Sequence, residues 1–141
     1  MADFLPIRGG IGADEPYWEA LRAGEFRLAR CAGCGEWMWP AHFRCGACGS
    51  WSVDWPEVVP EGRIYTWTRN HAVGEVVAER RGDLPYVTML VELPHAGGAR
   101  VAGVLDGSDE GLAVGTSGRG VIRPPEPRAK GYATMAWEIV R

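Results

Sequence analysis

The four cysteines are the residues of this sequence whose type and spacing point most directly to chemistry. They form two C-x-x-C pairs separated by ten residues: Cys31 and Cys34, then Cys45 and Cys48. Two thiolates bind one ion when the backbone between them turns tightly, and Gly35 and Gly49, which follow the pairs, tolerate positive φ at no steric cost. Two such turns facing each other supply the four sulfur ligands of a tetrahedral zinc site. The pattern therefore predicts a zinc ribbon.

The predicted cofactor is one structural zinc ion. Because all four ligands are sulfur, no coordination position stays open for water or substrate, and no free thiol remains to act as a nucleophile. Two other hypotheses explain the cysteines without a metal. A pair of disulfides is typical of secreted proteins, but no signal peptide is visible in the sequence. A redox site needs one C-x-x-C pair rather than two.

Composition and charge describe a globular chain with one domain, or two small domains in contact. Hydrophobic residues make up 46% and charged residues 23% of the 141 residues, and the formal net charge is -3. No apolar run approaches the ~20 residues that a membrane-spanning helix needs. Together with four reduced cysteines, these features predict a cytoplasmic protein.

A short helix and a few short strands must position the cysteines. Asp14 is a suitable N-cap and Gly24 a suitable end for the helix, and a strand at 25–30 would enter the first cysteine pair. We expect three segments: a flexible arm at 1–13, the N-terminal helix and a rubredoxin-like zinc ribbon at 14–56, and an OB-fold domain at 57–141.

The second half of the chain has the pattern of a small β-barrel. Apolar and polar residues alternate in several short runs that are separated by turn residues. The expected strands are 64–73, 85–93, 100–105, 120–123 and 132–140. A helical turn at 109–112 lies between the third and fourth strands. Five short strands with this spacing predict a mainly β protein that ends in a five-stranded Greek-key barrel of the OB type.

The sequence lacks the common catalytic patterns. It has three histidines, His42, His71 and His95, and we expect a structural rather than a catalytic role for each. It contains no Gly-x-Ser-x-Gly elbow and no phosphate-binding glycine loop. We therefore expect no enzyme activity from this chain alone.

Several motifs together resemble one known family, the acyl-CoA-associated zinc-ribbon/OB-fold proteins, formerly a domain of unknown function. The resemblance covers roughly residues 15–140. Its specific parts are the helix with an aromatic-Trp pair, the two C-x-x-C pairs, and three short motifs: Trp39-Pro40, Gly62 to Thr68, and Pro85-Tyr86-Val87 with Val91-Glu92-Leu93.

The resemblance implies a non-catalytic accessory subunit. Such a subunit binds and stabilises a thiolase or thiolase-like aldolase that acts on acyl-CoA thioesters in fatty-acid, steroid side-chain or aromatic-compound degradation. The partner carries the catalytic residues, and the chain is a required subunit of an acyl-CoA lyase or acyltransferase complex. A MaoC-like enoyl-CoA hydratase is an alternative partner. Nucleic-acid binding, common among zinc ribbons and OB folds, is the other alternative, but the acidic charge disfavours it.

Two groups of residues are candidates for contacts of this subunit. An excess of aromatic residues around a small ribbon has two explanations: the side chains cover the ribbon's own small core, or they form a protein interface. The interface candidates are Tyr17, Trp18, Leu21, Trp37, Trp39 and Phe43. Basic residues near the C-terminus suit the phosphates of CoA; these candidates are Arg119, Arg123, Arg128 and Lys130. Arg80 and Arg81, in a charged loop, form a second candidate site for phosphate.

Overall fold

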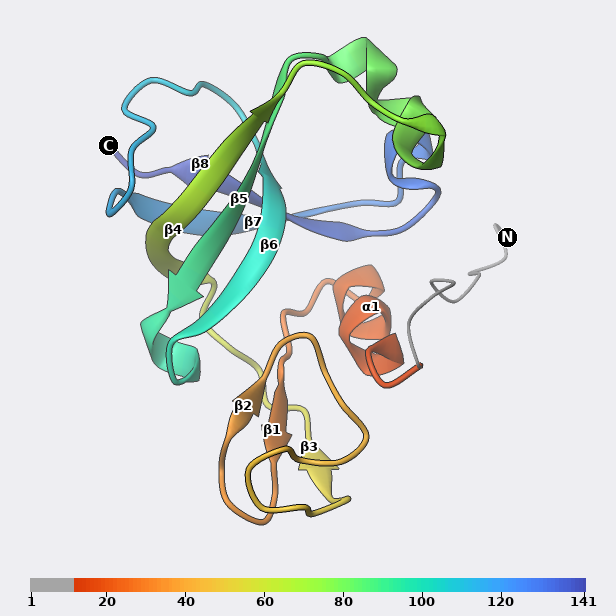
Figure 1. The fold of residues 1–141 in the computed structure, drawn as a ribbon, viewed down its shortest axis with the longest axis vertical. Coiled ribbons are helices and arrows are strands. Elements are labelled where there is room, and N and C mark those ends of the chain that lie inside the picture. Colours follow the sequence, from red (N-terminus) through yellow and green to blue (C-terminus); the bar gives the residue numbers. More distant parts are fainter. Residues whose placement is uncertain (1–11) are drawn as a thin grey trace.

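The protein is described here by a computed structural model that covers residues 12–141, so most of the expected arm at 1–13 lies outside the described residues. The first element of the described residues is one α-helix, α1 (Glu15–Arg22), as the sequence predicts (Figure 1). Asp14 takes the N-cap position, but its carboxylate accepts a hydrogen bond from Trp18 Nε1 at 3.0 Å rather than capping the backbone. Gly24, at a φ of +83°, ends the helix by donating to the carbonyl of Leu21.

The cysteine-rich part forms a three-stranded antiparallel sheet in the order β2-β1-β3. Its strands are β1 (Ala29–Cys31), β2 (Trp37–Met38) and β3 (Val53–Asp54). The strand expected at 25–30 is shorter than predicted. Before Ala29 the chain makes only an isolated bridge, between Arg27 and Glu57, because this segment crosses from the helix to the ribbon beside the barrel.

The second half closes into a five-stranded barrel in the order β4-β5-β6-β8-β7. Its strands are β4 (Glu61–Asn70), β5 (Tyr86–Leu93), β6 (Ala99–Leu105), β7 (Ser117–Arg123) and β8 (Thr134–Ile139). The pairs are antiparallel except β6 with β8, which run parallel. This is the OB-type barrel that the sequence predicts. The fourth strand starts three residues earlier than expected.

Three short 3-10 helices connect the barrel strands: η1 (Glu75–Asp83), η2 (Pro94–Ala96) and η3 (Pro127–Ala129). The first occupies the segment expected to be a charged loop and packs against η3. The helical turn expected at 109–112 is a hydrogen-bonded turn, in which the N–H of Leu112 donates to the carbonyl of Asp109. No helix in the described part of the chain has the length and apolar character to cross a membrane.

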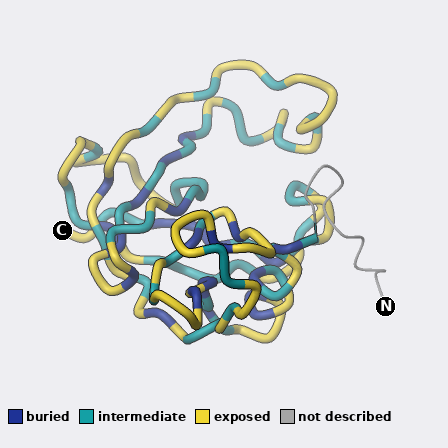
Figure 2. Tube along the Cα trace, turned by 60° about the horizontal axis from the view of Figure 1, so that its bottom comes forward, coloured by how far each residue is buried: buried dark blue, intermediate teal, exposed yellow. Residues whose placement is uncertain are grey.

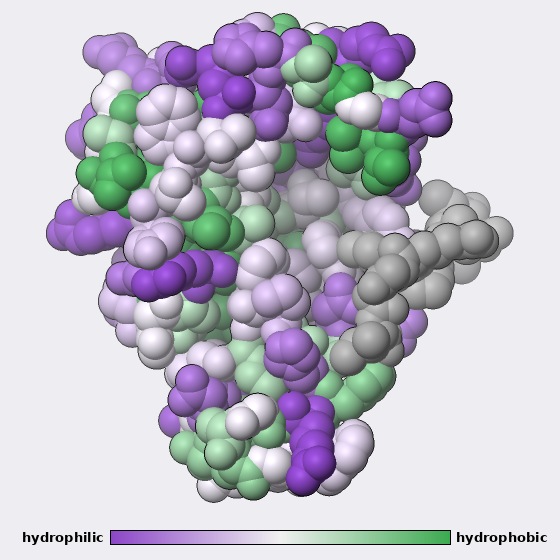
Figure 3. Space-filling view, viewed as in Figure 1, coloured by the Kyte–Doolittle hydropathy of each residue, from purple (hydrophilic) through white to green (hydrophobic). Residues whose placement is uncertain are grey.

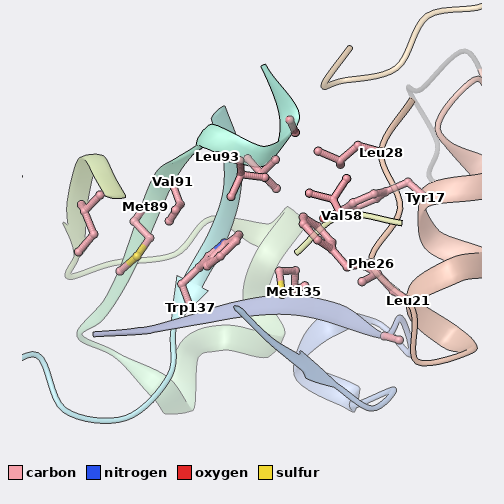
Figure 4. Close-up of a cluster of buried hydrophobic side chains, with 14 of the residues drawn as sticks. Tyr17, Leu21, Phe26, Leu28, Val58, Met89, Val91, Leu93, Met135 and Trp137 are labelled. Carbon is pink, nitrogen blue, oxygen red and sulfur yellow. The ribbon is translucent and has the colours of Figure 1, made fainter. Parts of the chain in front are cut away.

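One hydrophobic core joins the helix, the entrance to the ribbon and the barrel (Figure 4). Tyr17 and Leu21 from α1 point towards Phe26 and the barrel residues, and Trp137 of β8 is fully buried among them. Strand β5 alternates buried and partly exposed residues along its whole length, as a strand with one face on the core must. The boundary at residue 57 between two domains stays a prediction.

The buried Trp137 fits only because Gly103 lies opposite. A Cβ atom at residue 103 would lie 2.5 Å from Cδ1 of Trp137, closer than real Cβ atoms approach. The longest exposed stretches are in the ribbon loops, the β4–β5 connection and the β6–β7 loop (Figure 2). The core thus places the ribbon and the barrel against each other and leaves the cysteine loops at the surface.

Candidate functional site

The four cysteine sulfurs converge at the end of the ribbon. All four Sγ atoms lie within 4.8 Å of one another. The Sγ atoms of Cys31 and Cys48 are 3.5 Å apart, and those of Cys34 and Cys45 are 3.7 Å apart. A tetrahedron with Zn–S bonds of about 2.3 Å has edges of about 3.8 Å. The sulfur positions therefore fit one tetrahedral zinc ion, as the spacing predicts.

The backbone around the cysteines favours thiolates. The N–H of Cys34 donates to Cys31 Sγ, and the N–H of Ala47 donates to Cys45 Sγ, at 3.5 and 3.4 Å. The Cys34 N–H, with further N–H and sulfur contacts, lowers the pKa of the Cys31 thiol to about 6. The Glu36 N–H lowers the pKa of Cys34, but desolvation and the three neighbouring sulfurs outweigh it and raise that pKa to about 12. Four thiolates so close together need a cation between them.

The ribbon is therefore a site for one structural zinc ion. Cys31 and Cys45 are buried, at 2% exposure each, and Cys34 and Cys48 are exposed. The donor set of four sulfurs would hold the ion without an open position. The ion stabilises this end of the chain, because the ribbon has only a small core of its own around Ala29 and Met38.

A cleft of about 670 Å³ lies between α1 and the barrel. Its floor comes from β5, β6 and β8, and one wall carries Tyr17, Trp18 and Trp39. The opposite wall comes from η1, η3 and the loop that follows β6. The surface is visibly hollowed between the barrel and the ribbon half (Figure 3). Besides the zinc centre, this cleft is the second candidate site in the described chain.

Four arginines and four carboxylates line the cleft, and all of them are paired. Arg69 donates to Asp109 at 2.8 Å, and Arg80 lies 3.5 Å from Asp83. The remaining pairs are Arg123 with Asp106 and Glu126, and Arg128 with Asp83 and Glu126. The hydrogen bonds from Arg128 and Arg123 hold the pKa of Glu126 below its usual range. The cleft is charged but close to neutral as a whole.

The cleft contains none of the histidines or cysteines of the described chain. None of the three histidines lines it, and each of them is exposed; the four cysteines are at the other end of the ribbon. Glu126, ionised by its two arginines, is not available as a proton donor near neutral pH. The charged and aromatic side chains that line the cleft can contact a bound ligand.

The four residues predicted for CoA phosphates do not form one cluster. Arg123 and Arg128 line the cleft, together with Arg80 from the second candidate pair. Lys130 is not among the residues that line the cleft, and it donates to Glu79 of η1 at 2.9 Å. Arg119 is outside the cleft on β7, paired with Glu138 at 2.7 Å. Glu126 is the one acidic residue inside this basic segment of the sequence, and it pairs with Arg123 and Arg128. Its presence was the sequence signal that these two arginines have a partner within the chain.

Two of the six predicted interface residues are buried inside the chain. Tyr17 is 4% and Leu21 is 1% exposed. The expectation that they form an exposed docking edge needs correction, because the apolar side of α1 packs on the chain's own barrel and ribbon. Burial also raises the pKa of the Tyr17 hydroxyl far above its usual value, so this side chain stays neutral.

The other four candidates remain at least partly accessible. Trp18 lies edge-on to Tyr132 with ring centroids 5.7 Å apart, and Trp39 borders the same cleft. Trp37 is half-buried against the barrel, and Phe43 is 50% exposed on the ribbon. Their role in an interface stays a prediction. The most exposed aromatic of the described chain, Trp51 at 71%, was missing from the predicted set.

Comparisons with known proteins identify the ribbon and the fold. The family model of the ChsH2 rubredoxin-like zinc ribbon domain matches residues 18–54. No curated protein matches the chain in sequence. A chain of the solved "Ltp2-ChsH2(DUF35) aldolase" is similar with a TM-score of 0.77 and 22% identity, over 94% of this chain and 98% of that one.

A second solved structure, of a DUF35-family protein of unknown function from Sulfolobus solfataricus, has a TM-score of 0.62 and 14% identity. The match covers 94% of this chain and 89% of that one. The resemblance seen in the sequence is thus confirmed: residues 18–54 match the family model of the ChsH2 zinc ribbon, and the described chain shares its fold with these two solved structures.

Proposed function

We propose that this chain is a zinc-ribbon/OB-fold accessory subunit that binds and stabilises a thiolase or thiolase-like aldolase acting on acyl-CoA thioesters. One observation carries the proposal. The chain shares its fold, over nearly its whole length, with a chain of an Ltp2-ChsH2 aldolase, and it carries the ChsH2-type ribbon. A likeness at 22% identity establishes the fold, and the step from fold to partner is the proposal.

The chemistry of the cleft supports a role that depends on a partner. Its carboxylates are held by arginines, and no histidine or cysteine lines it. A catalytic nucleophile or general base would therefore come from the other subunit. The zinc is structural, since four sulfur ligands leave no position for a substrate. A reducing compartment such as the cytoplasm suits this site.

We propose in addition that the cleft contributes to CoA binding at the boundary of the two subunits. Arg123 and Arg128 present guanidinium groups that suit phosphate, and Trp18 and Trp39 offer aromatic surface for an adenine ring. A CoA phosphate would replace Glu126 as the partner of these arginines. DNA or RNA would fit the cleft less well than CoA, because a phosphate backbone needs a basic surface. The cleft is nearly neutral, and the chain has a net charge of -3.

The test is reconstitution. The tagged chain is purified from its native source, co-purifying proteins are identified by mass spectrometry, and the acyl-CoA enzyme found is expressed with and without this chain. Thiolase, retro-aldol and hydratase activities are then measured for each subunit alone and for the complex. We expect activity in the complex, none in this chain alone, and lower solubility or activity of the enzyme alone.

Each other outcome has a clear meaning. A MaoC-like hydratase as the bound enzyme would replace the thiolase part of the proposal. Steady turnover by this chain alone, abolished by a point substitution in it, would overturn the accessory role. A shift of labelled single-stranded DNA or RNA at physiological salt, without any enzyme partner, would favour nucleic-acid binding instead.

A further inference from the structure

The two halves of the zinc ribbon are copies of one eight-residue unit. The pattern Arg-Cys-x-x-Cys-Gly-x-Trp occurs at 30–37 and again at 44–51, so the copies are fourteen positions apart. The cysteines bind the metal and the glycine closes the turn. The arginine and the tryptophan are repeated as well, although neither binds the metal.

Both copies have the same backbone geometry. Arg30 Nε donates to the carbonyl oxygen of Gly35 at 3.1 Å, and Arg44 Nε donates to that of Gly49 at 3.0 Å. Both glycines have a φ of +80°. A Cβ atom at either glycine would lie 3.2 or 3.1 Å from a guanidinium nitrogen, so the arginine closes tightly over the turn in each copy.

In each copy the same guanidinium also lies over the tryptophan ring. Cζ of Arg30 is 5.3 Å from the ring centroid of Trp37, and Cζ of Arg44 is 5.8 Å from that of Trp51. A cation within about 6 Å of an indole face is attracted by the ring. The arginine is thus fixed by the glycine carbonyl and in turn orients the indole. Each unit presents one oriented tryptophan.

The first copy shows what such a tryptophan binds. Trp37 packs on Gly97 in the turn between β5 and β6, where a Cβ atom would lie 2.6 Å from the indole Cδ1. Gly97 also has a φ of +63°, in the left-handed region that favours glycine. The occupant of the first unit is therefore a glycine-containing turn whose bare backbone meets the edge of the indole. This contact connects the ribbon to the barrel.

The second copy has no such occupant among the described residues. Trp51 is 71% exposed and Phe43, next to Arg44, is 50% exposed. Only the tryptophan of the first unit, Trp37, packs against the core that includes the barrel, so the barrel does not cover Trp51. An oriented, exposed tryptophan has the character of an interface anchor, since such residues are enriched among those that dominate binding.

We infer that Trp51, oriented by Arg44, docks on a glycine-containing backbone turn of the partner enzyme. The two tryptophans of the ribbon would then each contact a glycine-containing turn. Trp37 contacts a turn of the chain's own barrel, and Trp51 would contact a turn of the other subunit. This inference rests on the proposed function and adds to it the surface that binds and the kind of backbone it receives.

The first test measures binding in the reconstituted complex with the acyl-CoA enzyme that co-purifies. We expect Trp51→Ala to raise Kd by at least about tenfold by calorimetry, while the zinc content and melting temperature of the free chain stay unchanged. Tyr65→Ala is the matched control. Tyr65 is also an exposed aromatic, 44% exposed, with the Arg100 Cζ 3.7 Å from its ring centroid, but it lies on the barrel outside the repeat.

The outcomes separate this inference from the proposed function. If the wild-type chain binds the enzyme and Trp51→Ala binds equally well, the inference is wrong and the accessory role stands. If Trp51→Ala loses zinc or melts early, the ring has a structural role and the inference is also wrong. If the wild-type chain binds no acyl-CoA enzyme, the proposed function itself fails.

A second test identifies the occupant. A photo-crosslinking benzoylphenylalanine replaces Trp51, and the complex is irradiated and digested. We expect adducts with one segment of the enzyme that contains glycine at a turn. Adducts with residues 1–11 of the same chain, or with a second copy of it, would show another occupant and overturn the inference. Adducts with a glycine-free segment would contradict the kind of turn we infer.

Discussion

The indole of Trp37 lies directly against Gly97, and this pair joins the zinc ribbon to the β5–β6 turn of the barrel. A methyl group at residue 97 would lie 2.6 Å from the ring. The orientation of the ribbon on the barrel therefore depends on a glycine that is far from the cysteines in sequence.

Gly97→Ala is expected to destabilise the chain by about 2–4 kcal/mol. About 1 kcal/mol comes from the left-handed backbone, and about 1–3 kcal/mol comes from overpacking against the indole. Gly107→Ala is the control, because Gly107 has a φ of +83° and a methyl carbon added there would have no atom within 4 Å. Urea unfolding compares the two variants. Equal losses in free energy of unfolding would mean that the contact with Trp37 contributes little.

Removing one cysteine ligand is expected to remove the zinc and the soluble fold. Cys31→Ser and Cys48→Ser each leave three thiolates, and zinc binding is coupled to folding in small metal sites. His42→Ala is the control, since this exposed histidine lies in the spacer between the cysteine pairs. Elemental analysis of the purified chains measures zinc per chain. A folded cysteine variant with a full zinc ion would contradict the proposed ligand set.

The cleft arginines are expected to affect the binding of CoA esters rather than turnover. In the complex, Arg123→Ala together with Arg128→Ala is expected to raise KM several-fold and leave kcat nearly unchanged, as for an interaction shared by ground and transition states. Arg119→Ala is the control, because Arg119 lies outside the cleft and pairs with Glu138. KM and kcat are measured by steady-state kinetics with the natural acyl-CoA ester. Unchanged KM in the double variant would remove the cleft from CoA binding.

Substitution of a buried residue near the ribbon is expected to lower the stability of the chain, whereas substitution of an exposed one is expected to weaken binding to the partner. Leu21→Ala, at 1% exposure, is expected to cost about 2–5 kcal/mol of folding free energy. Phe43→Ala, at 50% exposure, is expected to leave the melting temperature unchanged and to weaken the complex. Thermal melting of the free chain and calorimetry with the partner are measured together. Normal binding by Phe43→Ala would remove this residue from the interface.

The zinc site and the order of the elements were evident in the sequence because their causes are local. Two C-x-x-C pairs fix the ligands within a few residues of each other, and the glycines after them mark the turns. The alternation of buried and exposed residues along β5 reflects the geometry of a strand with one face on the core. Such signals need no knowledge of the rest of the chain.

The tertiary structure alone decided which surfaces and charges are free. Tyr17 and Leu21 suit an interface by type, but the barrel covers them. The basic residues near the C-terminus form a cluster only in sequence, because β7 carries Arg119 away from the cleft that Arg123 and Arg128 line. Their carboxylate partners include residues from distant loops, which a linear pattern does not bring together.

The close contacts between glycine and tryptophan could not be predicted from the sequence either. Gly97 with Trp37, and Gly103 with Trp137, fit because one backbone leaves room for the other's ring. Neither glycine differs in sequence from the glycines that only end turns. What the sequence determined by itself was the local chemistry of the metal and the period of the strands. Packing between distant segments decided where the ribbon sits, which aromatics are buried, and that Trp51 stays exposed, since close contact is a property of the folded chain.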